Sequence, residues 1–184
     1  GNRNKNKRKI YFEEYRMING IDQYLFHAGT DYDNPVMLFL HGMGITESVT
    51  AHMFQRKWEE LYTVVHLDQR GAGKTYTKNP ETEPTLEMQL QDVYEVVEYL
   101  KERYNKDKIV ILGHSWGSIL GTIYAQRYPE NVLYYIGTGQ VVNVLEGERR
   151  GYEKARNIAL ERNDKKALKK LDSICEYPYK ESSE

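Results

Sequence analysis

The sequence predicts an α/β fold, in which helices flank a mostly parallel sheet. Short apolar runs that suit buried strands alternate with longer segments whose apolar residues recur every three or four positions. One such run, Val36 to Leu40, is entirely apolar, as expected of a strand buried on both faces. With 184 residues, the chain is long enough for one domain, or for one domain and the beginning of an inserted segment.

Six strands are expected from residue 10 onward. The first two, Ile10 to Met17 and Gln23 to His27, are predicted to pair as a hairpin because Asn19-Gly20 between them is a strong turn signal. The other four are apolar runs at 36–40, 62–67, 108–112 and 134–136.

Three helices are expected between these strands. The clearest follows Thr85, a good N-cap, and carries one apolar stripe: Leu86, Leu90, Val93, Val97, Leu100 and Tyr104. A shorter helix is marked by Phe54, Trp58 and Leu61. The third runs from Trp116 to Tyr128 before Pro129, with small residues that allow close packing on the sheet: Gly117, Gly121 and Ala125.

The chain is expected to fall into three parts. Residues 1–9 are polar and basic and read as a disordered tail, and residues 10–145 form the α/β core. Residues 146–184 are charged and helical in pattern, with Asp164 as the cap of a helix that carries Leu168, Leu171 and Cys175. We interpret this last part as the start of a helical cap, the alternative being a C-terminal helical tail that packs on the sheet.

Composition excludes several functional classes. The 26 basic and 27 acidic residues give a formal net charge of −1, so no overall field favours nucleic acid. The single cysteine, Cys175, excludes an internal disulfide, and no spacing of histidines suggests a metal, so we expect no cofactor. No apolar run approaches a membrane span, which favours a cytoplasmic location; the alternative is a membrane anchor once preceding the basic start.

The segment Gly113-His114-Ser115-Trp116-Gly117 has the G-x-S-x-G pattern of a nucleophile elbow. It lies between an expected strand and an expected helix, the context that this motif requires. Ser115 is therefore the candidate nucleophile, and the amide of Trp116 at the start of the helix is a candidate oxyanion donor. We expect His114 to be structural, because it must point away from the direction of attack.

A second oxyanion donor is expected from the glycine-rich loop His41-Gly42-Met43-Gly44, which follows an expected strand. The amide of Met43 is the candidate, and Gly42 and Gly44 are expected to border the substrate. His41 is expected to hold the loop by hydrogen bonds instead of acting as a base.

The segment Asp68-Gln69-Arg70-Gly71-Ala72-Gly73-Lys74-Thr75 ends like a phosphate-binding loop. That motif requires glycine where Asp68 stands, and a helix directly afterwards, which Asn79-Pro80 and Glu83-Pro84 argue against. Nucleotide binding is therefore not expected. Asp68 and Arg70 are instead predicted to pair with each other and brace the rim of the active site.

These three motifs together resemble the proline iminopeptidase family of α/β-hydrolases over about residues 10–145. The resemblance implies a serine hydrolase that cleaves peptide, amide or ester bonds of small substrates. The family's loop usually reads H-G-G-P-G, so Met43 is a departure that bears on substrate selectivity. The resemblance also implies that the acid, the histidine and the cap carboxylates lie beyond residue 184, so the fold is expected to stop before its last strands.

The position of the histidines limits the catalytic prediction. All five, His27, His41, His52, His66 and His114, precede Ser115, whereas this fold places its acid and histidine after the nucleophile. The 184-residue chain is therefore expected to be nearly inactive alone. Two alternatives remain: a non-catalytic module that self-associates through an exposed sheet edge, or a second chain that supplies the missing groups.

Overall fold

The computed structural model describes residues 7–43, 46–48, 51, 55–81, 83–140 and 144–172. The chain divides into two compact units, residues 1–140 and 141–184. Among these residues, the first unit contains the sheet, and the second contains the helices that follow it. The boundary lies close to position 145, where the sequence analysis placed the end of the core.

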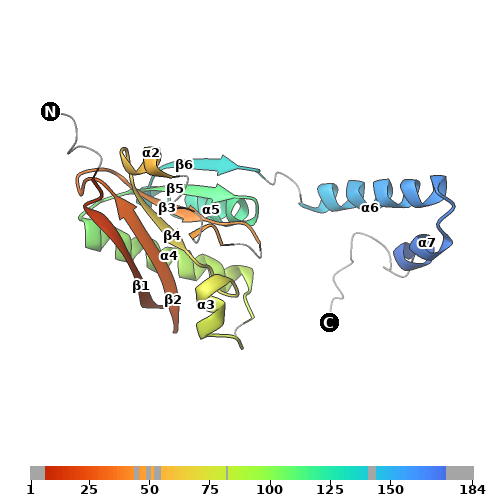
Figure 1. Ribbon diagram of the computed structural model, residues 1–184, viewed down its shortest axis with the longest axis horizontal. Coiled ribbons are helices and arrows are strands. Elements are labelled where there is room, and N and C mark those ends of the chain that lie inside the picture. The colour runs from red at the N-terminus through yellow and green to blue at the C-terminus, as the bar shows by residue number, and fades with distance from the viewer. Residues whose placement is uncertain are drawn as a thin grey trace. The chain divides into compact units, whose positions relative to one another are not determined.

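The first unit is a six-stranded sheet with helices on both faces (Figure 1). Its strands are β1 (Ile10–Ile18), β2 (Ile21–Gly29), β3 (Val36–Leu40), β4 (Thr63–Leu67), β5 (Ile109–His114) and β6 (Val132–Thr138). All six expected strands are present, within one or a few residues of their predicted ends.

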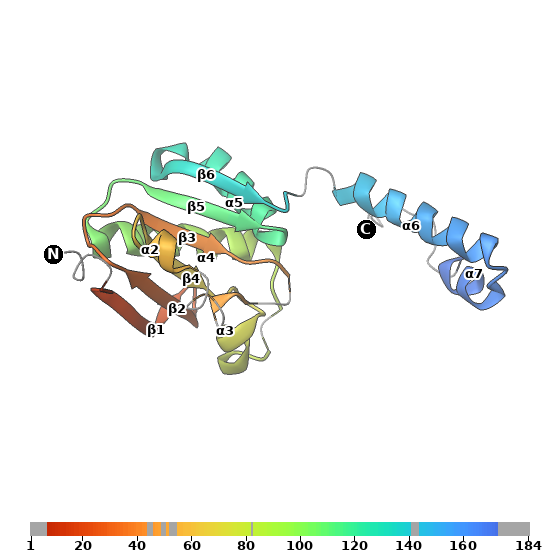
Figure 2. The same ribbon diagram turned by 45° about the horizontal axis from the view of Figure 1, so that its top comes forward.

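The strand order is β1-β2-β4-β3-β5-β6, with β1 and β6 at the two edges (Figure 2). Strands β4, β3, β5 and β6 run parallel to one another, and β1 and β2 form an antiparallel hairpin, of which β2 pairs antiparallel with β4. The chain passes from β3 to β4 on one side and then to β5 on the other. The loops after β3, β4 and β5 therefore meet at one edge, at a topological switch point where ligands bind in open α/β sheets.

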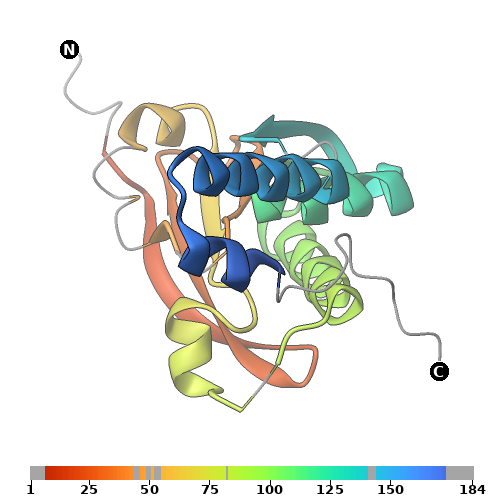
Figure 3. The ribbon, with the colours of Figure 1, turned by 90° about the vertical axis from the view of Figure 1, so that its right-hand side faces the viewer.

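Two helices cover one face of the sheet, α4 (Leu86–Tyr104) and α5 (Trp116–Arg127), while α2 (Arg56–Glu59) lies on the other (Figure 3). This unit also contains the helical segments α3 (Gly73–Lys78) and η1 (Pro129–Asn131). The alternation of strand side chains explains the two layers. Val36, Leu38 and Leu40 belong to the large core under α4 and α5, whereas Met37 and Phe39 belong to a smaller cluster on the opposite face.

The predicted N-cap and most of the predicted apolar stripe of α4 are confirmed. The side chain of Thr85 accepts a hydrogen bond from the amide of Met88, and the stripe residues from Leu90 onward are buried. Leu86 is an exception, because its side chain is 38% exposed. Its side chain lines a cavity instead of joining the core under the helix.

The helix predicted from Phe54, Trp58 and Leu61 departs further from its prediction, because the expected apolar residues do not form its buried face. Phe54 lies outside the described residues, and Trp58 and Leu61 are 43% and 63% exposed. The buried member of α2 is Glu59, whose carboxylate accepts hydrogen bonds from Arg8, Gln55 and Arg56. Arg8 and Lys9 are thus not part of a solvated tail: Arg8 binds Glu59, and the amide of Lys9 donates to the carbonyl of Gly29.

Two histidines belong to the core. The Nδ1 atom of His27 lies 2.7 Å from the Tyr104 hydroxyl and its Nε2 atom 3.0 Å from Glu14. The Nε2 atom of His66 lies 2.7 Å from the side-chain oxygen of Gln55, and burial lowers the pKa of His66 to about 3. Both residues therefore have structural roles, whereas His52 lies outside the described residues.

The second unit contains α6 (Val144–Glu161) and α7 (Lys165–Asp172). As predicted, Asp164 caps the second of these helices, since its carboxylate accepts hydrogen bonds from the amides of Lys166 and Ala167. Arg156 of α6 forms an ion pair with Asp172 of α7. Cys175 lies outside the described residues. No helix among the described residues has the length and apolar character needed to cross a membrane.

Candidate active site

Ser115 stands at the turn between β5 and α5 in a strained backbone conformation. Its φ is 51° and its ψ is −114°, and the other non-glycine residues with positive φ among those described are all asparagines. Asn105, with ψ at 56°, has the left-handed helical geometry that asparagine tolerates, whereas Ser115 lies outside it in a positive-φ region that costs about 1–3 kcal/mol. Strain of this kind at a strand-to-helix turn is what a nucleophile elbow requires.

Two glycines make this turn possible. A Cβ atom at Gly113 would lie 2.3 Å from the carbonyl oxygen of Gly117, and one at Gly117 would lie 1.9 Å from the carbonyl oxygen of Leu40. Both contacts are far shorter than real Cβ atoms show, and both involve backbone that cannot turn aside. The G-x-S-x-G pattern is thus explained by close packing of the elbow on itself and on the end of β3.

The backbone of Ser115 is held from two sides. Its amide donates to the carbonyl of Thr138 at the end of β6, and its carbonyl accepts from the amide and the hydroxyl of Ser118. The side chain of Ser115 is half-buried. The fold therefore fixes the backbone of this residue while its hydroxyl remains near the surface.

The loop after β3 lies directly against the elbow. A Cβ atom at Gly42 would lie 3.3 Å from the Cβ atom of Ser115, so glycine here allows the loop to approach the serine. Met43, the next residue, is exposed. Gly44 lies outside the described residues.

His41 is locked by Gln69 of the loop after β4. The Gln69 amide donates to His41 Nε2 at 3.0 Å, and the Gln69 side chain donates to the His41 carbonyl at 2.8 Å. Since Nε2 accepts, Nδ1 carries the proton and donates to the carbonyl of Gly42. Burial lowers the pKa of His41, so the ring stays neutral, and with both nitrogens engaged it cannot take a proton from Ser115.

His114 is also engaged beside the elbow. Its Nδ1 atom lies 3.0 Å from the hydroxyl of Thr138, and a Cβ atom at Gly139 would lie 3.2 Å from its Cε1 atom. The ring thus packs against the end of β6. This placement agrees with the structural role expected of His114.

The predicted pairing of Asp68 with Arg70 is wrong. Arg70 forms a buried, bidentate ion pair with Asp92 of α4, with both N–O distances at 2.9 Å, and also donates to the carbonyl of Asn19. Asp68 accepts hydrogen bonds from the Ser48 hydroxyl and the Lys74 amide. Residues two positions apart share one face only within a strand, and β4 ends at Leu67, so this spacing does not bring the side chains of Asp68 and Arg70 together.

Burial of Asp68 raises the pKa of its carboxyl, although its hydrogen bonds act in the opposite direction. Through Ser48, this carboxyl ties the loop after β3 to the loop after β4. Sequence reasoning did not identify Ser48. A serine within a polar loop has no spacing signal that would distinguish it.

A short helix does follow the phosphate-loop-like segment, contrary to expectation: α3 begins at Gly73. The reason is that Asn79 and Pro80 end the helix after six residues instead of preventing it. The amide of Lys74 donates a hydrogen bond to the carboxylate of Asp68, and a Cβ atom at Gly73 would clash with Asp68 Oδ2. The amide that would face a phosphate thus already faces an anion.

A cavity of about 280 Å³ opens beside the elbow. It lies between the loops after β3 and β4, the start of α4 and the start of α5, and its lining residues are His41, Gly42, Met43, Gln69, Arg70, Gly71, Ala72, Pro84, Leu86, Gln89 and Trp116. The indole nitrogen of Trp116 donates to the side-chain oxygen of Gln89 at 3.2 Å. The cavity thus brings residues from all three motifs to one place.

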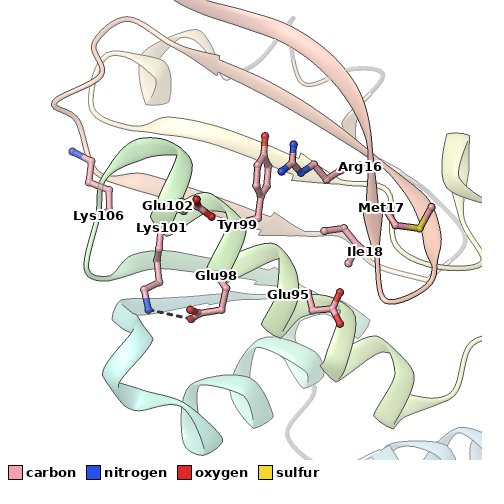
Figure 4. Close-up of a pocket in the computed structure, with 9 residues that line it drawn as sticks. All are labelled: Arg16, Met17, Ile18, Glu95, Glu98, Tyr99, Lys101, Glu102 and Lys106. Atoms are coloured by element: carbon pink, nitrogen blue, oxygen red, sulfur yellow. Dashed lines mark hydrogen bonds and ion pairs between the residues drawn. The ribbon is translucent and has the colours of Figure 1, made fainter.

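A second depression, of about 520 Å³, lies between the end of β1 and α4 (Figure 4). Its charged groups interact with neighbours: Lys101 pairs with Glu98, Glu95 accepts from the amide of Asn19, and Arg16 stacks on Tyr99. None of the three motifs contributes to it. We therefore assign the candidate active site to the smaller cavity. Within the described part of the chain, no cluster of three or more potential ligands could hold a metal ion.

The sequence model of the alpha/beta hydrolase fold family matches residues 35–167. A probable aminopeptidase of Bacillus subtilis, YbaC, is 35% identical over 155 residues, which cover 83% of this chain and 49% of that protein. Proline iminopeptidase of Neisseria gonorrhoeae is 29% identical over 119 residues, which cover 64% of this chain and 36% of that enzyme.

The crystal structure of an epoxide hydrolase from Vigna radiata superposes with a TM-score of 0.56 at 23% identity, covering 69% of this chain and 39% of that one. This likeness supports the fold alone. The chain spans about half the length of its aminopeptidase relative, and less of the iminopeptidase. The family match, the sheet topology and the strained serine agree, and the chain belongs to the α/β-hydrolase fold family.

Proposed function

We propose that this chain carries the nucleophile and the oxyanion-binding loops of a serine hydrolase that cleaves peptide, amide or ester bonds, as in proline iminopeptidases. The observation that carries the proposal is the strained backbone of Ser115, with φ at 51°, directly against the loop that contains Gly42. The similarity to a probable aminopeptidase and to a proline iminopeptidase supports the same class of substrate.

In this proposal, the Ser115 hydroxyl attacks the substrate carbonyl and its oxygen becomes an oxyanion. The amides of Trp116 and Met43 receive that charge, and each such donor is typically worth roughly 3 kcal/mol of transition-state stabilisation. Trp116 begins α5, so the positive end of the helix dipole adds to the effect. Collapse of the intermediate releases the amine or alcohol and leaves an acyl ester on Ser115, which water then hydrolyses.

A base must take the proton from Ser115 during attack. The histidines of the two neighbouring motifs, His41 and His114, are both engaged in structural contacts. No histidine follows position 114 in the 184 residues. We therefore propose that the acid and the histidine come from further polypeptide, and that these 184 residues alone turn over little substrate.

The helices α6 and α7 form a separate unit directly after β6. We propose that they begin a cap over the substrate, in line with the resemblance to iminopeptidases. The alternative, a helical tail, differs in one measurable respect: deleting a cap changes substrate selectivity, whereas deleting a tail affects stability alone.

Sequence similarity to epoxide hydrolases, 29–32% identical over 113–119 residues, suggests a second substrate class, and the nucleophile argues against it. Attack of a serine oxygen on an epoxide carbon gives an alkyl ether, which water does not hydrolyse, so the enzyme would stop after one turnover. Attack on a carbonyl gives an ester, which water does hydrolyse. Serine at the elbow therefore favours acyl substrates.

A non-catalytic assembly module is the candidate from another class. Strand β6 is an edge strand, and Leu133 and Tyr134 on it are 49% and 42% exposed. Exposed edges of this kind favour association. Sedimentation of the 184-residue chain as a stable monomer would contradict this alternative.

A fluorophosphonate probe tests the hydrolase proposal, because it reacts with activated serines. The mass of the natural gene product is measured first. Labelling is then compared between that product and the 184-residue chain, each with and without the substitution Ser115→Ala. We expect labelling at Ser115 in the natural product and little in the 184-residue chain. Labelling at another residue, or none in a natural product that contains a downstream histidine, would overturn the assignment of Ser115. Rapid labelling of the 184-residue chain would overturn the requirement for further polypeptide.

A further inference from the structure

The cavity beside the elbow is walled mainly by apolar side chains that the fold leaves exposed. Met43 is 75% and Leu86 38% exposed, Pro84 is exposed and Trp116 is half-buried. They come from three separate segments: the loop after β3, the approach to α4 and the start of α5. Exposed apolar groups that converge on one hollow mark a ligand site more often than isolated ones do.

Arg70 and most of the neutral polar side-chain groups of the same cavity are directed to protein partners. Arg70 is neutralised by Asp92 at 2.9 Å, and Gln89 accepts from the indole of Trp116. The side-chain nitrogen of Gln69 donates to the carbonyl of His41, whereas its side-chain oxygen is a buried acceptor that has no hydrogen-bond partner among the described residues, so a neutral N–H or O–H donor could still bind it. The wall therefore offers a ligand no unpaired charge from the residues that line the cavity, and a charged group entering it would lose water without gaining a counter-ion.

The cavity lies next to the candidate nucleophile. Gly42 lines the cavity and also lies against Ser115, with 3.3 Å between the two Cβ positions. Trp116 lines it and follows Ser115 directly. A group held in the cavity is thus adjacent to any bond that Ser115 attacks. At about 30 Å³ for each non-hydrogen atom, 280 Å³ holds roughly nine such atoms.

We propose that this cavity is a subsite for an uncharged apolar group of the substrate, aliphatic or aromatic, of up to about nine non-hydrogen atoms. The exposure of Leu86 follows from this role, because the side chain faces the subsite instead of the sheet. The assignment of the bound group to a substrate rests on the proposed function. The binding of apolar molecules to the cavity does not.

The two tryptophans of the chain allow a direct test without turnover. Trp58 lies on α2 and does not line the cavity, so Trp58→Phe leaves Trp116 as the single indole reporter. The ligands are three matched cyclohexane derivatives: cyclohexanecarboxamide, cyclohexanecarboxylate and cyclohexylmethylammonium. We expect saturable change in Trp116 fluorescence with the neutral amide, at a dissociation constant on the order of 1 mM for nine atoms. The two ions are expected to bind at least tenfold more weakly.

Leu86→Ala provides the matched wall variant. It removes apolar contact from the mouth of the cavity and should weaken amide binding about fivefold to tenfold, with no change for the ions. Calorimetric titration of the unsubstituted chain gives the same affinities without any substitution, so the test stands if a variant fails to fold. Equal binding of all three ligands, or no saturable binding of the amide, would overturn the proposal.

The outcomes separate this inference from the proposed function. Amide binding in a protein whose Ser115 never reacts with fluorophosphonate would retain the subsite and reject the hydrolase. Labelling of Ser115 by fluorophosphonate without binding of the amide would retain the hydrolase and reject the subsite.

Discussion

Replacing Gly117 by alanine tests the packing on which the candidate site depends. The added Cβ atom would lie 1.9 Å from the carbonyl oxygen of Leu40, 2.5 Å from its carbon and 2.8 Å from the carbonyl oxygen of His41. All three atoms are backbone, so α5 must move away from β3 as a unit. Overpacking costs roughly 1–3 kcal/mol, and contacts this short place the cost at the upper end.

Alanine also has a helix propensity better than that of glycine by about 1 kcal/mol, which offsets part of that cost. We therefore expect Gly117→Ala to lower the free energy of unfolding by about 2 kcal/mol, equivalent to roughly 4–8 °C in Tm for a chain of this size. The assay is urea unfolding followed by tryptophan fluorescence and by far-UV circular dichroism. Both tryptophans lie in the first unit, so fluorescence reports on that unit alone.

Two further glycines provide graded controls. At Gly121, the added Cβ atom would meet side-chain atoms of Tyr135 and Ile111 at 2.7 Å and 3.2 Å, and side chains can move, so the loss should be smaller. At Gly151 in α6 nothing lies within 4 Å, so alanine should raise helix stability by about 0.5–1 kcal/mol. A Gly117→Ala variant as stable as the parent chain would refute the close approach of α5 to β3.

Three further predictions concern buried charge. Arg70→Leu should destabilise the chain by about 3–5 kcal/mol, because it leaves Asp92 buried without a counter-ion, whereas the double variant with Asp92→Leu should recover part of that loss in urea unfolding. The pKa of His66 is about 3 in the folded protein, so between pH 6.5 and 3 only the unfolded chain protonates this histidine. We therefore expect the contribution of His66 to the free energy of unfolding to be complete above pH 6.5 and to fall below it by up to about 1.4 kcal/mol per pH unit. His66→Gln should reduce the dependence of the free energy of unfolding on pH between pH 6.5 and 5. Arg8→Ala should cost about 1–3 kcal/mol in thermal unfolding because Glu59 is fully buried, and no loss would mean that Arg8 belongs to the tail after all.

The local features of the site were predictable from sequence because their causes are local. The elbow needs glycine at two fixed positions around Ser115, and a strand and a helix on either side, so a short motif carries all of its requirements. The same holds for the Thr85 cap and for the Asn19-Gly20 turn.

The features that were missed depend on partners far apart in the chain. Arg70 pairs with Asp92, which is brought to it by packing of α4 on the sheet, and Arg8 reaches Glu59 across 51 positions. Nothing in the periodicity of either segment identifies these partners. Leu86 shows the same limit, because it fits the apolar stripe of α4 but lines a cavity and is partly exposed, which only its tertiary surroundings decide.

The spacing of the proposed oxyanion donors follows from contact between backbones. Gly117 abuts the carbonyls of Leu40 and His41, where the loop to Met43 begins, and Gly113 abuts the carbonyl of Gly117. No side chain lies between these segments, so the distance between the two donor loops is set by main-chain atoms that have few alternative positions. Substitution of cavity side chains such as Leu86 should therefore alter which group binds, while the geometry at Ser115 stays unchanged. Selectivity and nucleophile placement are separable in this fold because different parts of the backbone determine them.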